Sequence, residues 1–352
     1  MGILYFTKQF CLCLLGSLVL VVCSCNTQKK LLSSFVPSNP VAPEQLLLGD
    51  PYILRTDGRY YLYGTTDSSE GFRSWSSEDL KHWEPLGFVY RKTETSYGSG
   101  RFWAPEVHYD PYTDNYVMVY SAKKDKTSPY RLCMARSDTP KSPFLDELTP
   151  YLPIEDWGQI DPHLFWDKTG APYLFFNRVG ILTPGSKNGT LHRAKPSAEI
   201  YAVALTKDLK TMVGVPTVCV RASQEWELSS DSTNYCNEGS FVFEFGGLYF
   251  MTYSANHYKS PKYGIGYATA SHPLGPWKKS RNNPLLYTIK EKGLSGPGHN
   301  SFTRSPDGED LLIVYHSHAD PSKPGASRHL NIEKAFIDAE GNLHVKIAPE
   351  RK

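Results

Sequence analysis

The chain has 352 residues, and 38 Lys and Arg against 36 Asp and Glu give it a formal net charge of only +2 at pH 7. Hydrophobic residues make up 40% and charged residues 21%, a balance typical of globular proteins rather than disordered chains. The near-neutral charge and the absence of a basic cluster argue against a nucleic-acid partner, because phosphate binding needs a concentrated cationic face. Aromatic residues reach 13%, and together with 27 Gly and 26 Pro they favour short strands joined by turns.

The first 24 residues have the features of an export signal. Lys8 supplies a positive charge, and Phe10–Val22 is an apolar run too short to span a bilayer as a helix. The sequence Val22-Cys23-Ser24-Cys25 that follows resembles a bacterial lipobox. We predict lipidation at Cys25, because the residue before it is small, with a simple signal peptide cleaved nearby as the alternative.

The residues after this signal divide into a short tether and one domain. Residues 25–44 are polar and contain Lys, Ser and Pro, so they are predicted to form the tether, and residues 45–352 form the domain. The protein is then an exported lipoprotein of the cell envelope, facing the periplasm or lying at the outer membrane. It contacts the membrane only through its lipid anchor.

Three cysteines remain in the predicted domain, namely Cys133, Cys219 and Cys236. Their odd number and the lack of a C-x-x-C spacing argue against a zinc site. The sequence leaves two interpretations open, one disulfide with one free thiol or three buried free thiols.

A two-strand unit recurs five times along the predicted domain. Each copy has a run opened by an acidic or polar residue, a turn containing Gly, Asp or Asn, and an aromatic-rich run, as in a β-hairpin. The opening residues are Asp50, Glu106, Asp161, Glu238 and His299. The copies recur roughly every 60 residues and further short strands follow most of them, which predicts an all-β, five-bladed β-propeller. A pair of stacked β-sandwiches fits the number of strands but not their even spacing.

One interval between copies is longer than the others. It contains Gly185–Pro196, a stretch rich in Gly, Lys and Pro that we interpret as an inserted loop. We expect this loop to lie where it can close the mouth of the central channel.

The five opening residues have a common place in a propeller. If each begins the innermost strand of its blade, all five lie at one end of the central channel. Buried carboxylates are costly unless they are paired or hydrogen-bonded, so their convergence predicts a functional site. For each carboxylate taken alone, capping of backbone amides at a turn or strand end is the alternative.

The motifs around these residues resemble those of glycoside hydrolase family 43. The matching motifs, in family order and at blade spacing, are Gly49-Asp50-Pro51, Asp57-Gly58-Arg59-Tyr60-Tyr61, Trp103-Ala104-Pro105-Glu106-Val107, Ile160-Asp161-Pro162-His163, Asn237-Glu238-Gly239 and Gly296-Pro297-Gly298-His299. Each motif is weak alone, whereas the ordered set covers essentially the whole predicted domain. The resemblance implies a five-bladed propeller that cleaves arabinose- or xylose-containing polysaccharides.

Three catalytic carboxylates follow from the resemblance. Asp50 matches the general base, Glu238 the general acid, and Asp161 the carboxylate that orients the acid and tunes its pKa. Inverting hydrolysis needs one ionised carboxylate to activate water and one protonated carboxyl at the leaving oxygen, about 6.5–9.5 Å apart. The pKa of the acid must rise for it to stay protonated near neutral pH, which Asp161 as a like charge and apolar neighbours such as Phe241 favour.

Two further residues are implied by the same resemblance. His299 matches a channel histidine that in some members binds calcium or another ion through water, so we expect a structural calcium near it, hydrogen bonding to substrate, or simple packing. The chemistry itself requires no cofactor. Arg328 matches an arginine that points into the sugar pocket, with a surface arginine as the alternative.

Several aromatic and acidic residues are predicted to contact substrate. Trp103 and Trp75 are expected to stack on sugar rings, although packing within a blade explains Trp75 equally well. Phe241 and Glu106 complete the predicted contacts, and Glu106 stands where the family often has Asp.

The leading functional hypothesis is an exo-acting α-L-arabinofuranosidase working on arabinan, arabinoxylan or a similar plant polysaccharide. β-Xylosidase and endo-arabinanase activities share the same chemistry and stay open. A non-catalytic glycan-binding lipoprotein with a propeller fold is the alternative from a different class. The presence of all three carboxylates argues against it, and the order of the motifs argues against a fructan-cleaving propeller enzyme.

Overall fold

A computed structural model of the protein describes residues 35–42, 44–141, 143–152, 157–187, 190–228 and 235–348. In these ranges the chain forms twenty β-strands and two short 3-10 turns, η1 (Glu225–Glu227) and η2 (Lys290–Lys292), without an α-helix. Neither of these helical turns is long and apolar enough to cross a membrane. The predicted signal peptide, the lipidation site Cys25 and the first part of the predicted tether lie outside the described residues.

The strands fall, in chain order, into five groups of four. The first group is β1 (Gly49–Thr56), β2 (Arg59–Thr65), β3 (Gly71–Ser77) and β4 (Glu84–Arg91), and the second is β5 (Gly100–Asp110), β6 (Asn115–Lys123), β7 (Arg131–Ser137) and β8 (Leu145–Tyr151). The third group is β9 (Gly158–Trp166), β10 (Pro172–Lys187), β11 (Thr190–Leu205) and β12 (Met212–Val220). The fourth is β13 (Tyr235–Phe245), β14 (Leu248–Ala255), β15 (Gly264–Ala270) and β16 (Lys278–Lys279), and the fifth is β17 (Gly298–Arg304), β18 (Leu311–His318), β19 (Arg328–Ile337) and β20 (Leu343–Lys346). Within each group the strands pair antiparallel in chain order, and β11 also pairs parallel with β13.

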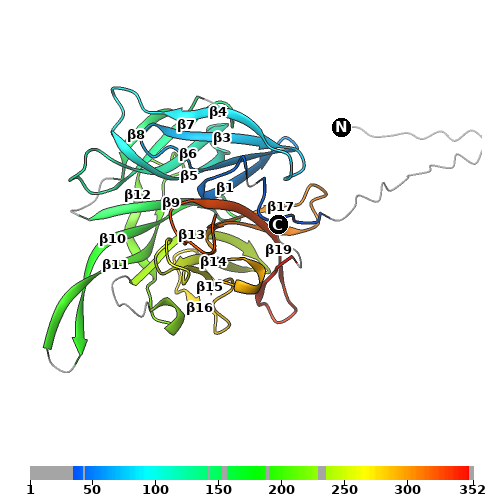
Figure 1. Ribbon diagram of the computed structural model, residues 1–352. Coiled ribbons are helices and arrows are strands. Elements are labelled where there is room, and N and C mark those ends of the chain that lie inside the picture. The colour runs from blue at the N-terminus through cyan, green and yellow to red at the C-terminus, as the bar shows by residue number, and fades with distance from the viewer. Residues whose placement is uncertain are drawn as a thin grey trace, which may run out of the picture. The chain divides into compact units, whose positions relative to one another are not determined.

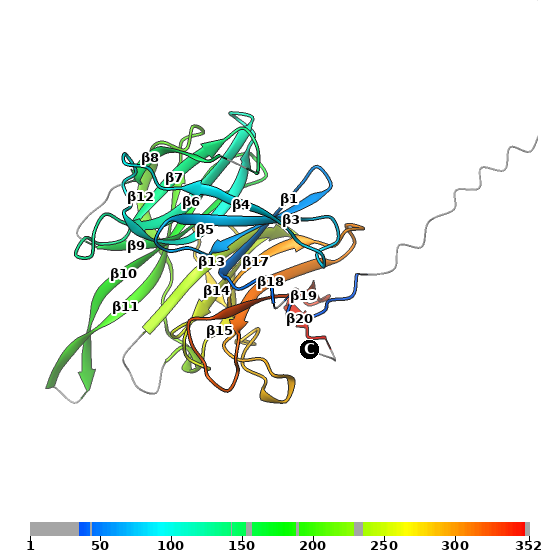
Figure 2. The same ribbon diagram turned by 45° about the horizontal axis from the view of Figure 1, so that its top comes forward.

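The first strands of the five groups pack against one another in cyclic order. β1 contacts β5, β5 contacts β9, β9 contacts β13, β13 contacts β17, and β17 contacts β1. Figures 1 and 2 show the groups arranged around these strands. Apolar side chains of neighbouring groups form the core in five clusters. The predicted all-β class is confirmed, and the arrangement fits a five-bladed propeller in which each group is a blade.

Each first strand carries a β-bulge near its start, where the pairing with the second strand shifts register. The residue at the bulge has a positive φ in every blade: Asp50 (54°), Ala104 (47°), Asp161 (55°), Gly239 (59°) and His299 (45°). A left-handed backbone costs a residue with a Cβ atom on the order of 1–3 kcal/mol unless its surroundings hold it. The surroundings of these five residues therefore need explanation.

A hydrogen bond from the preceding blade holds each bulge. The backbone N–H groups donate to side chains of the second strands: Asp50 to His316 Nδ1 (3.0 Å), Ala104 to Thr65 Oγ1 (2.8 Å), Asp161 to Ser121 Oγ (2.9 Å), Gly239 to Asn177 Oδ1 (3.3 Å) and His299 to Ser254 Oγ (2.7 Å). The fifth blade supplies the acceptor for the first. The five bonds thus connect the blades in a closed ring.

The bulges correct the predicted alignment of the five repeats. Asp50, Asp161 and His299 are bulge residues as the alignment implied. Glu238 lies one residue before its bulge residue, and Glu106 lies two residues after its own, because the bulges of those blades fall at Gly239 and Ala104. A shift along a strand changes the direction of a side chain, so the five openings are not equivalent.

Part of the predicted tether belongs to the domain. The compact unit begins at Phe35, and the side chains of Phe35 and Val41 are buried in a cluster with residues of β19. The Asn39 side chain donates to the carbonyl of Ile332 (2.7 Å) and accepts from its N–H (2.8 Å). Apolar residues at these positions explain the packing, which the polar composition of the segment as a whole concealed.

The stretch predicted as an inserted loop is strand instead. In its described residues, Gly185–Pro196 extends the antiparallel pairing of β10 with β11. Figures 1 and 2 show this long hairpin projecting away from the other strands.

Candidate active site

A cavity of about 550 Å³ opens where the bulged strands begin. All five blades contribute to its lining, which includes Gly49, Asp50, Thr65, Arg101, Trp103, Ile160, Asp161, Glu238, Tyr258, His299 and Arg328. Of the residues predicted to form a site, the structure thus brings together the three carboxylates, Trp103, His299 and Arg328. The repeat is the reason, because equivalent strand ends in a propeller meet around one axis.

Asp50 is surrounded by donors and positive charge. Arg328 Nη1 donates to its Oδ1 at 2.9 Å, Thr65 Oγ1 donates to its Oδ2 at 2.5 Å, and His299 Nδ1 lies 3.3 Å from Oδ1. Burial opposes ionisation of this carboxyl, but the charges of Arg328 and His299, with the Thr65 hydroxyl, outweigh it and hold its pKa well below the usual range. Asp50 is therefore a carboxylate throughout the neutral range.

The space around Asp50 depends on the glycine before it. A Cβ atom at Gly49 would lie only 2.1 Å from the guanidinium carbon of Arg328. Any side chain at this position would therefore push Arg328 away from Asp50. This contact gives a packing reason for the Gly49-Asp50 pair in the sequence.

Asp161 differs from Asp50 in its protonation. Burial and the nearby charges of Glu238 and Asp50 raise its pKa to about 8, although His299 and the N–H of Gly239 act in the opposite direction. Asp161 thus holds a proton at neutral pH. Two carboxyls in one cavity with opposite protonation are the arrangement that acid–base chemistry requires.

The raised pKa of Asp161 predicts an alkaline limit to activity. A carboxyl with a raised pKa keeps its proton below that value and loses it above, so we expect kcat/KM to fall as the pH rises through about 8. In Asp161→Asn this decline should shift or disappear together with a loss of activity. The measurement is kcat/KM across neutral and alkaline pH, with Asp167→Asn, in a turn at the other end of β9, as the control. An unchanged alkaline limb in Asp161→Asn would contradict the assignment.

Glu238 is held by two donors that the sequence did not reveal. Tyr263 donates its hydroxyl to Oε1 at 2.7 Å, and the Cys236 thiol donates to Oε2 at 3.1 Å. The Tyr263 ring stacks on His316 with an interplanar angle of 7°, and a Cβ atom at Gly298 would come within 1.9 Å of it. Gly298 therefore leaves the space in which Tyr263 reaches the carboxyl.

The thiol contact also answers the question about the cysteines. Cys133, Cys219 and Cys236 are all free and buried. Of the two interpretations that the sequence leaves open, three buried free thiols is therefore the correct one.

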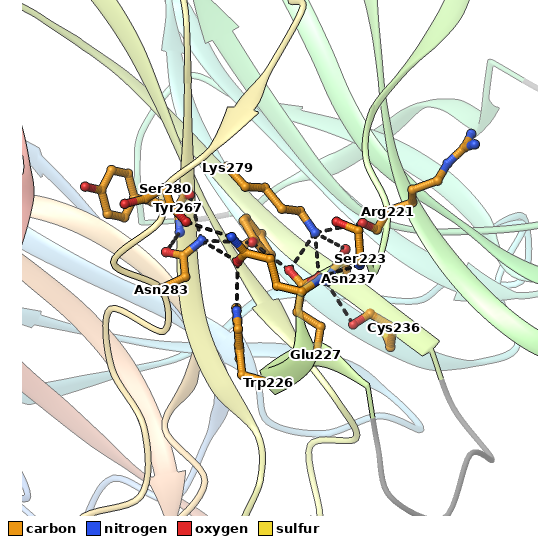
Figure 3. Close-up of polar contacts among 12 residues, drawn as sticks. Arg221, Ser223, Trp226, Glu227, Cys236, Asn237, Tyr267, Lys279, Ser280 and Asn283 are labelled. Atoms are coloured by element: carbon orange, nitrogen blue, oxygen red, sulfur yellow. Dashed lines mark hydrogen bonds and ion pairs between the residues drawn. The ribbon is translucent and has the colours of Figure 1, made fainter.

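A buried ion pair supports the strand that carries Glu238 (Figure 3). Lys279 Nζ lies 2.5 and 2.7 Å from the carboxylate oxygens of the fully buried Glu227, and it also donates to Asn237 Oδ1 at 3.1 Å. The Glu227 carboxylate further accepts the Tyr253 hydroxyl (2.7 Å) and two backbone N–H groups. Because Asn237 directly precedes Glu238, this network fixes the backbone next to the carboxyl.

Removing Lys279 is expected to destabilise the fold. Lys279→Met leaves the Glu227 carboxylate buried without its cation, which typically costs about 3–5 kcal/mol. The double variant Lys279→Met, Glu227→Gln removes both charges and should recover most of that loss. Urea unfolding of the two variants beside the wild type measures the difference. Equal stability of the single and double variants would show that the unpaired charge is not the cause.

Three predicted contact residues lie elsewhere. Trp75, on β3, packs against an apolar cluster formed by the first blade, the fifth blade and the segment that precedes β1. Phe241 packs on Tyr52, His163 and Phe302. Glu106 is buried in hydrogen bonds to histidines. None of the three is among the cavity-lining residues found in the described part of the chain, so the structure does not bring them to the candidate site with the others. Phe241 and Glu106 lie outside the cavity for the same reason, because each is two residues beyond the bulge residue of its strand.

Glu106, His108 and His163 form a cluster whose ligand atoms lie within 4.8 Å of one another. His163 Nε2 accepts the N–H of Val242 (3.0 Å), so its proton sits on Nδ1, which donates to Glu106 Oε2 (2.7 Å). His108 Nε2 lies 3.0 Å from the same oxygen. A metal would need the Nδ1 lone pair of His163, which carries the proton instead. The cluster is therefore satisfied by its own hydrogen bonds and does not fit a metal ion.

His299 lies in the cavity with the three carboxyls, where the sequence predicts a calcium ion. Burial opposes a charge on the ring, but Asp50, Asp161 and Glu238 outweigh it and raise the pKa of His299. The three carboxyls around the ring thus favour its charged form, which balances part of their negative charge. We derive no step through a metal, and the calcium site stays a prediction.

The arrangement of carboxyls in this cavity is typical of one class of protein. An ionised carboxylate, a second carboxyl held by two donors and a third that keeps its proton line one cavity with an arginine and a tryptophan. Such carboxyl pairs are the machinery of glycoside hydrolases. Residues 37–343 match the sequence model of the family described as Glycosyl hydrolases family 43. The chain belongs to this family, as the motifs predicted.

Individual relatives agree with this assignment. The chain is 27% identical over 329 residues to the extracellular exo-alpha-(1->5)-L-arabinofuranosidase of Streptomyces avermitilis, covering 88% of this chain but only 64% of the relative. Among solved structures it is 38% identical to a thermostable family-43 glycoside hydrolase, with a TM-score of 0.80 over 90% of this chain and 97% of the other. It is 33% identical to the endo-1,4-beta-xylanase from Bacteroides thetaiotaomicron, with a TM-score of 0.72 over 86% and 94%.

Proposed function

We propose that the protein is an inverting, exo-acting α-L-arabinofuranosidase that removes arabinose from plant polysaccharide. The observation that carries the proposal is the contrast between Asp50 and its neighbours in one cavity. Asp50 is held ionised by Arg328 and Thr65, whereas Asp161 beside Glu238 holds a proton. Because Glu238 contributes to the raised pKa of Asp161, these two neighbouring carboxyls hold a proton between them beside the ionised Asp50, which is the division between acid and base that an inverting hydrolysis needs.

In this mechanism the two proton transfers occur on opposite sides of the scissile bond. Asp50 accepts a proton from water as the water oxygen attacks the anomeric carbon. Glu238 donates a proton to the leaving oxygen as the glycosidic bond breaks, and Asp161 and Tyr263 hold it in position. Arg328, which lies over the Tyr258 ring at 4.9 Å, fixes Asp50 and borders the place of the sugar.

Two observations support an exo-acting arabinofuranosidase. The cavity of about 550 Å³ is of a size that holds a small ligand with much of its surface buried. The relative from Streptomyces avermitilis carries that activity in its name.

A xylan-directed activity is the second candidate. The solved structure that is 33% identical to this chain is named as an endo-1,4-beta-xylanase, and it matches along nearly its whole length. The same carboxyls serve either sugar, because the choice depends on how the cavity fits the ring and its substituents.

Paired aryl glycosides test these proposals. We expect turnover of the α-L-arabinofuranoside above that of the β-D-xyloside, with the activity lost in Glu238→Ala. Proton NMR of the first-formed sugar reports whether its anomeric configuration is inverted. Preference for the xyloside would favour the second candidate. No turnover of either, with debranched arabinan cleaved, would indicate an endo-arabinanase, and binding without cleavage would indicate a glycan-binding protein.

We also propose that the protein is exported and lipidated at Cys25. The apolar run and the Ser24-Cys25 pair support this proposal, as does the word extracellular in the name of the Streptomyces relative. A fatty-acid probe should label the wild type but not Cys25→Ser, whereas labelling of both would contradict it.

A further inference from the structure

A second cavity, of about 620 Å³, adjoins the candidate active site. Ser68 and Arg101 line both cavities, so the two share a wall. The second cavity lies where the β2–β3 and β6–β7 loops and the β4–β5 connection meet the start of β5, and its lining includes Lys92, Lys123, Lys126 and Tyr130. A glycan with one sugar in the first cavity can therefore extend across this wall into the second.

An aromatic pair bridges the two cavities. Trp103 lines the first, Tyr130 lines the second, and their rings stack with centroids 4.5 Å apart and an interplanar angle of 29°. Arg101, two residues before Trp103, has a φ of 59° within an irregular stretch of β5. A left-handed arginine is an uncommon and strained conformation, and such residues gather at binding sites.

The lining of the second cavity carries four cationic side chains and one carboxylate. The carboxylate, Asp125, accepts hydrogen bonds from Thr127 and Ser128 of its own loop. Lys92 is also engaged, since it donates to two backbone carbonyls and pairs with Glu70 at 3.2 Å. The positive charge that could bind a ligand therefore belongs to Arg101, Lys123 and Lys126.

Among the described residues, none accepts a hydrogen bond from these three side chains or forms an ion pair with them. Lys123 Nζ lies over the Tyr130 ring, 4.7 Å from its centroid. Its ammonium thus sits on the aromatic pair that leads out of the active site. In a protein whose net charge is only +2, this local excess of positive charge is concentrated at the edge of the site.

We propose that the second cavity binds the carboxylate of a uronic acid in the same glycan whose neutral sugar occupies the active-site cavity. The guanidinium of Arg101 offers paired N–H donors that match a carboxylate, and the two ammonium groups add charge. The face of Trp103 turned away from Tyr130 can stack on an intervening sugar, while Tyr130 holds Trp103 on one side and the Lys123 ammonium over its ring. This inference rests on the proposed glycosidase function and specifies its substrate as an acidic polysaccharide.

The test compares acidic and neutral substrates that share the same scissile sugar. We expect the wild type to hydrolyse an oligosaccharide bearing a hexuronic acid with about tenfold higher kcat/KM than its neutral counterpart, the effect of one charge-assisted hydrogen bond. The double variant Lys123→Gln, Lys126→Gln should lose this preference, and added salt should weaken it in the wild type. Lys124→Gln, on the exposed residue between them in sequence, is the matched control and should keep it.

Separate readouts distinguish the inference from the function on which it rests. Turnover of an aryl glycoside, which has no uronate, reports the active-site cavity alone and serves as the reference for every variant. Calorimetric binding of the acidic oligosaccharide reports the second cavity even if no glycoside is cleaved. Equal kcat/KM for acidic and neutral substrates, or a preference unchanged in the double variant, would overturn the proposal. Oligosaccharides bearing glucuronate and galacturonate, tested in parallel, identify the source of the carboxylate.

Discussion

Glu238→Gln is expected to slow hydrolysis of a natural glycoside by about 10³-fold, within the range for loss of a general acid. The amide has no acidic proton to give to the leaving oxygen. Its carbonyl can still accept the Tyr263 hydroxyl as Oε1 does, so the side chain should stay in place. A dinitrophenyl glycoside, whose leaving group departs without a proton, should lose far less activity.

The comparison of the two leaving groups decides between a chemical and a structural role. Steady-state kcat/KM is measured for both substrates with the wild type, Glu238→Gln and Glu244→Gln. Glu244 lies further along β13 and serves as the matched control, with no expected change. If Glu238→Gln slows both substrates equally, Glu238 is not the general acid.

Asp50→Asn should have a larger effect, about 10⁴-fold, on every substrate regardless of its leaving group. The proposed base acts on water, so a better leaving group cannot replace it. The substitution also removes the carboxylate that Arg328 and Thr65 hold, so that the position of the base and its charge are both altered. We therefore place this variant at the upper end of the range for general acid–base catalysis.

A neighbouring aspartate provides the control. Asp57, in the turn between β1 and β2, also has a positive φ, and asparagine tolerates this conformation well. Asp57→Asn should keep full activity. A dinitrophenyl glycoside that Asp50→Asn hydrolyses nearly as fast as the wild type would contradict the role of Asp50 as the base.

The sequence was sufficient to predict the all-β class and the five repeated hairpins because each hairpin has local sequence signals. Turn residues between aromatic-rich runs marked one hairpin in each of the five blades. The carboxyls Asp50 and Asp161 were placed correctly because Asp at a strand start and the following Pro mark the bulge in their blades. Their roles in catalysis stay predictions.

The position of the bulge in the second and fourth blades was not predictable from such a signal. A bulge inserts one residue whose backbone angle leaves no mark in an alternating pattern. Ala104 and Gly239 occupy the bulges of their blades, yet the more conspicuous Glu106 and Glu238 were aligned there. For this reason Glu106 and Phe241 were expected at the cavity, although its lining does not include them.

Partners that come from distant parts of the chain were also missed. Tyr263 and Cys236 hold Glu238, and His316 holds the backbone of Asp50, but nothing local marks these pairings. A signal was present in the second strands. A polar residue of each second strand pairs with the residue just before the bulge, and aligning the five hairpins would have shown this set: Thr65, Ser121, Asn177, Ser254 and His316.

The ring of hydrogen bonds between blades has a consequence for when the enzyme becomes competent. Asp50 lies on the first strand to leave the ribosome, yet the groups that fix its backbone and its charge, His316 and Arg328, lie on the fifth blade. The proposed base is therefore assembled only when the fifth blade docks against the first. A nascent chain holding four folded blades carries all three proposed catalytic carboxyls and still lacks a complete site, so synthesis of these residues and the onset of chemistry would be separated in time.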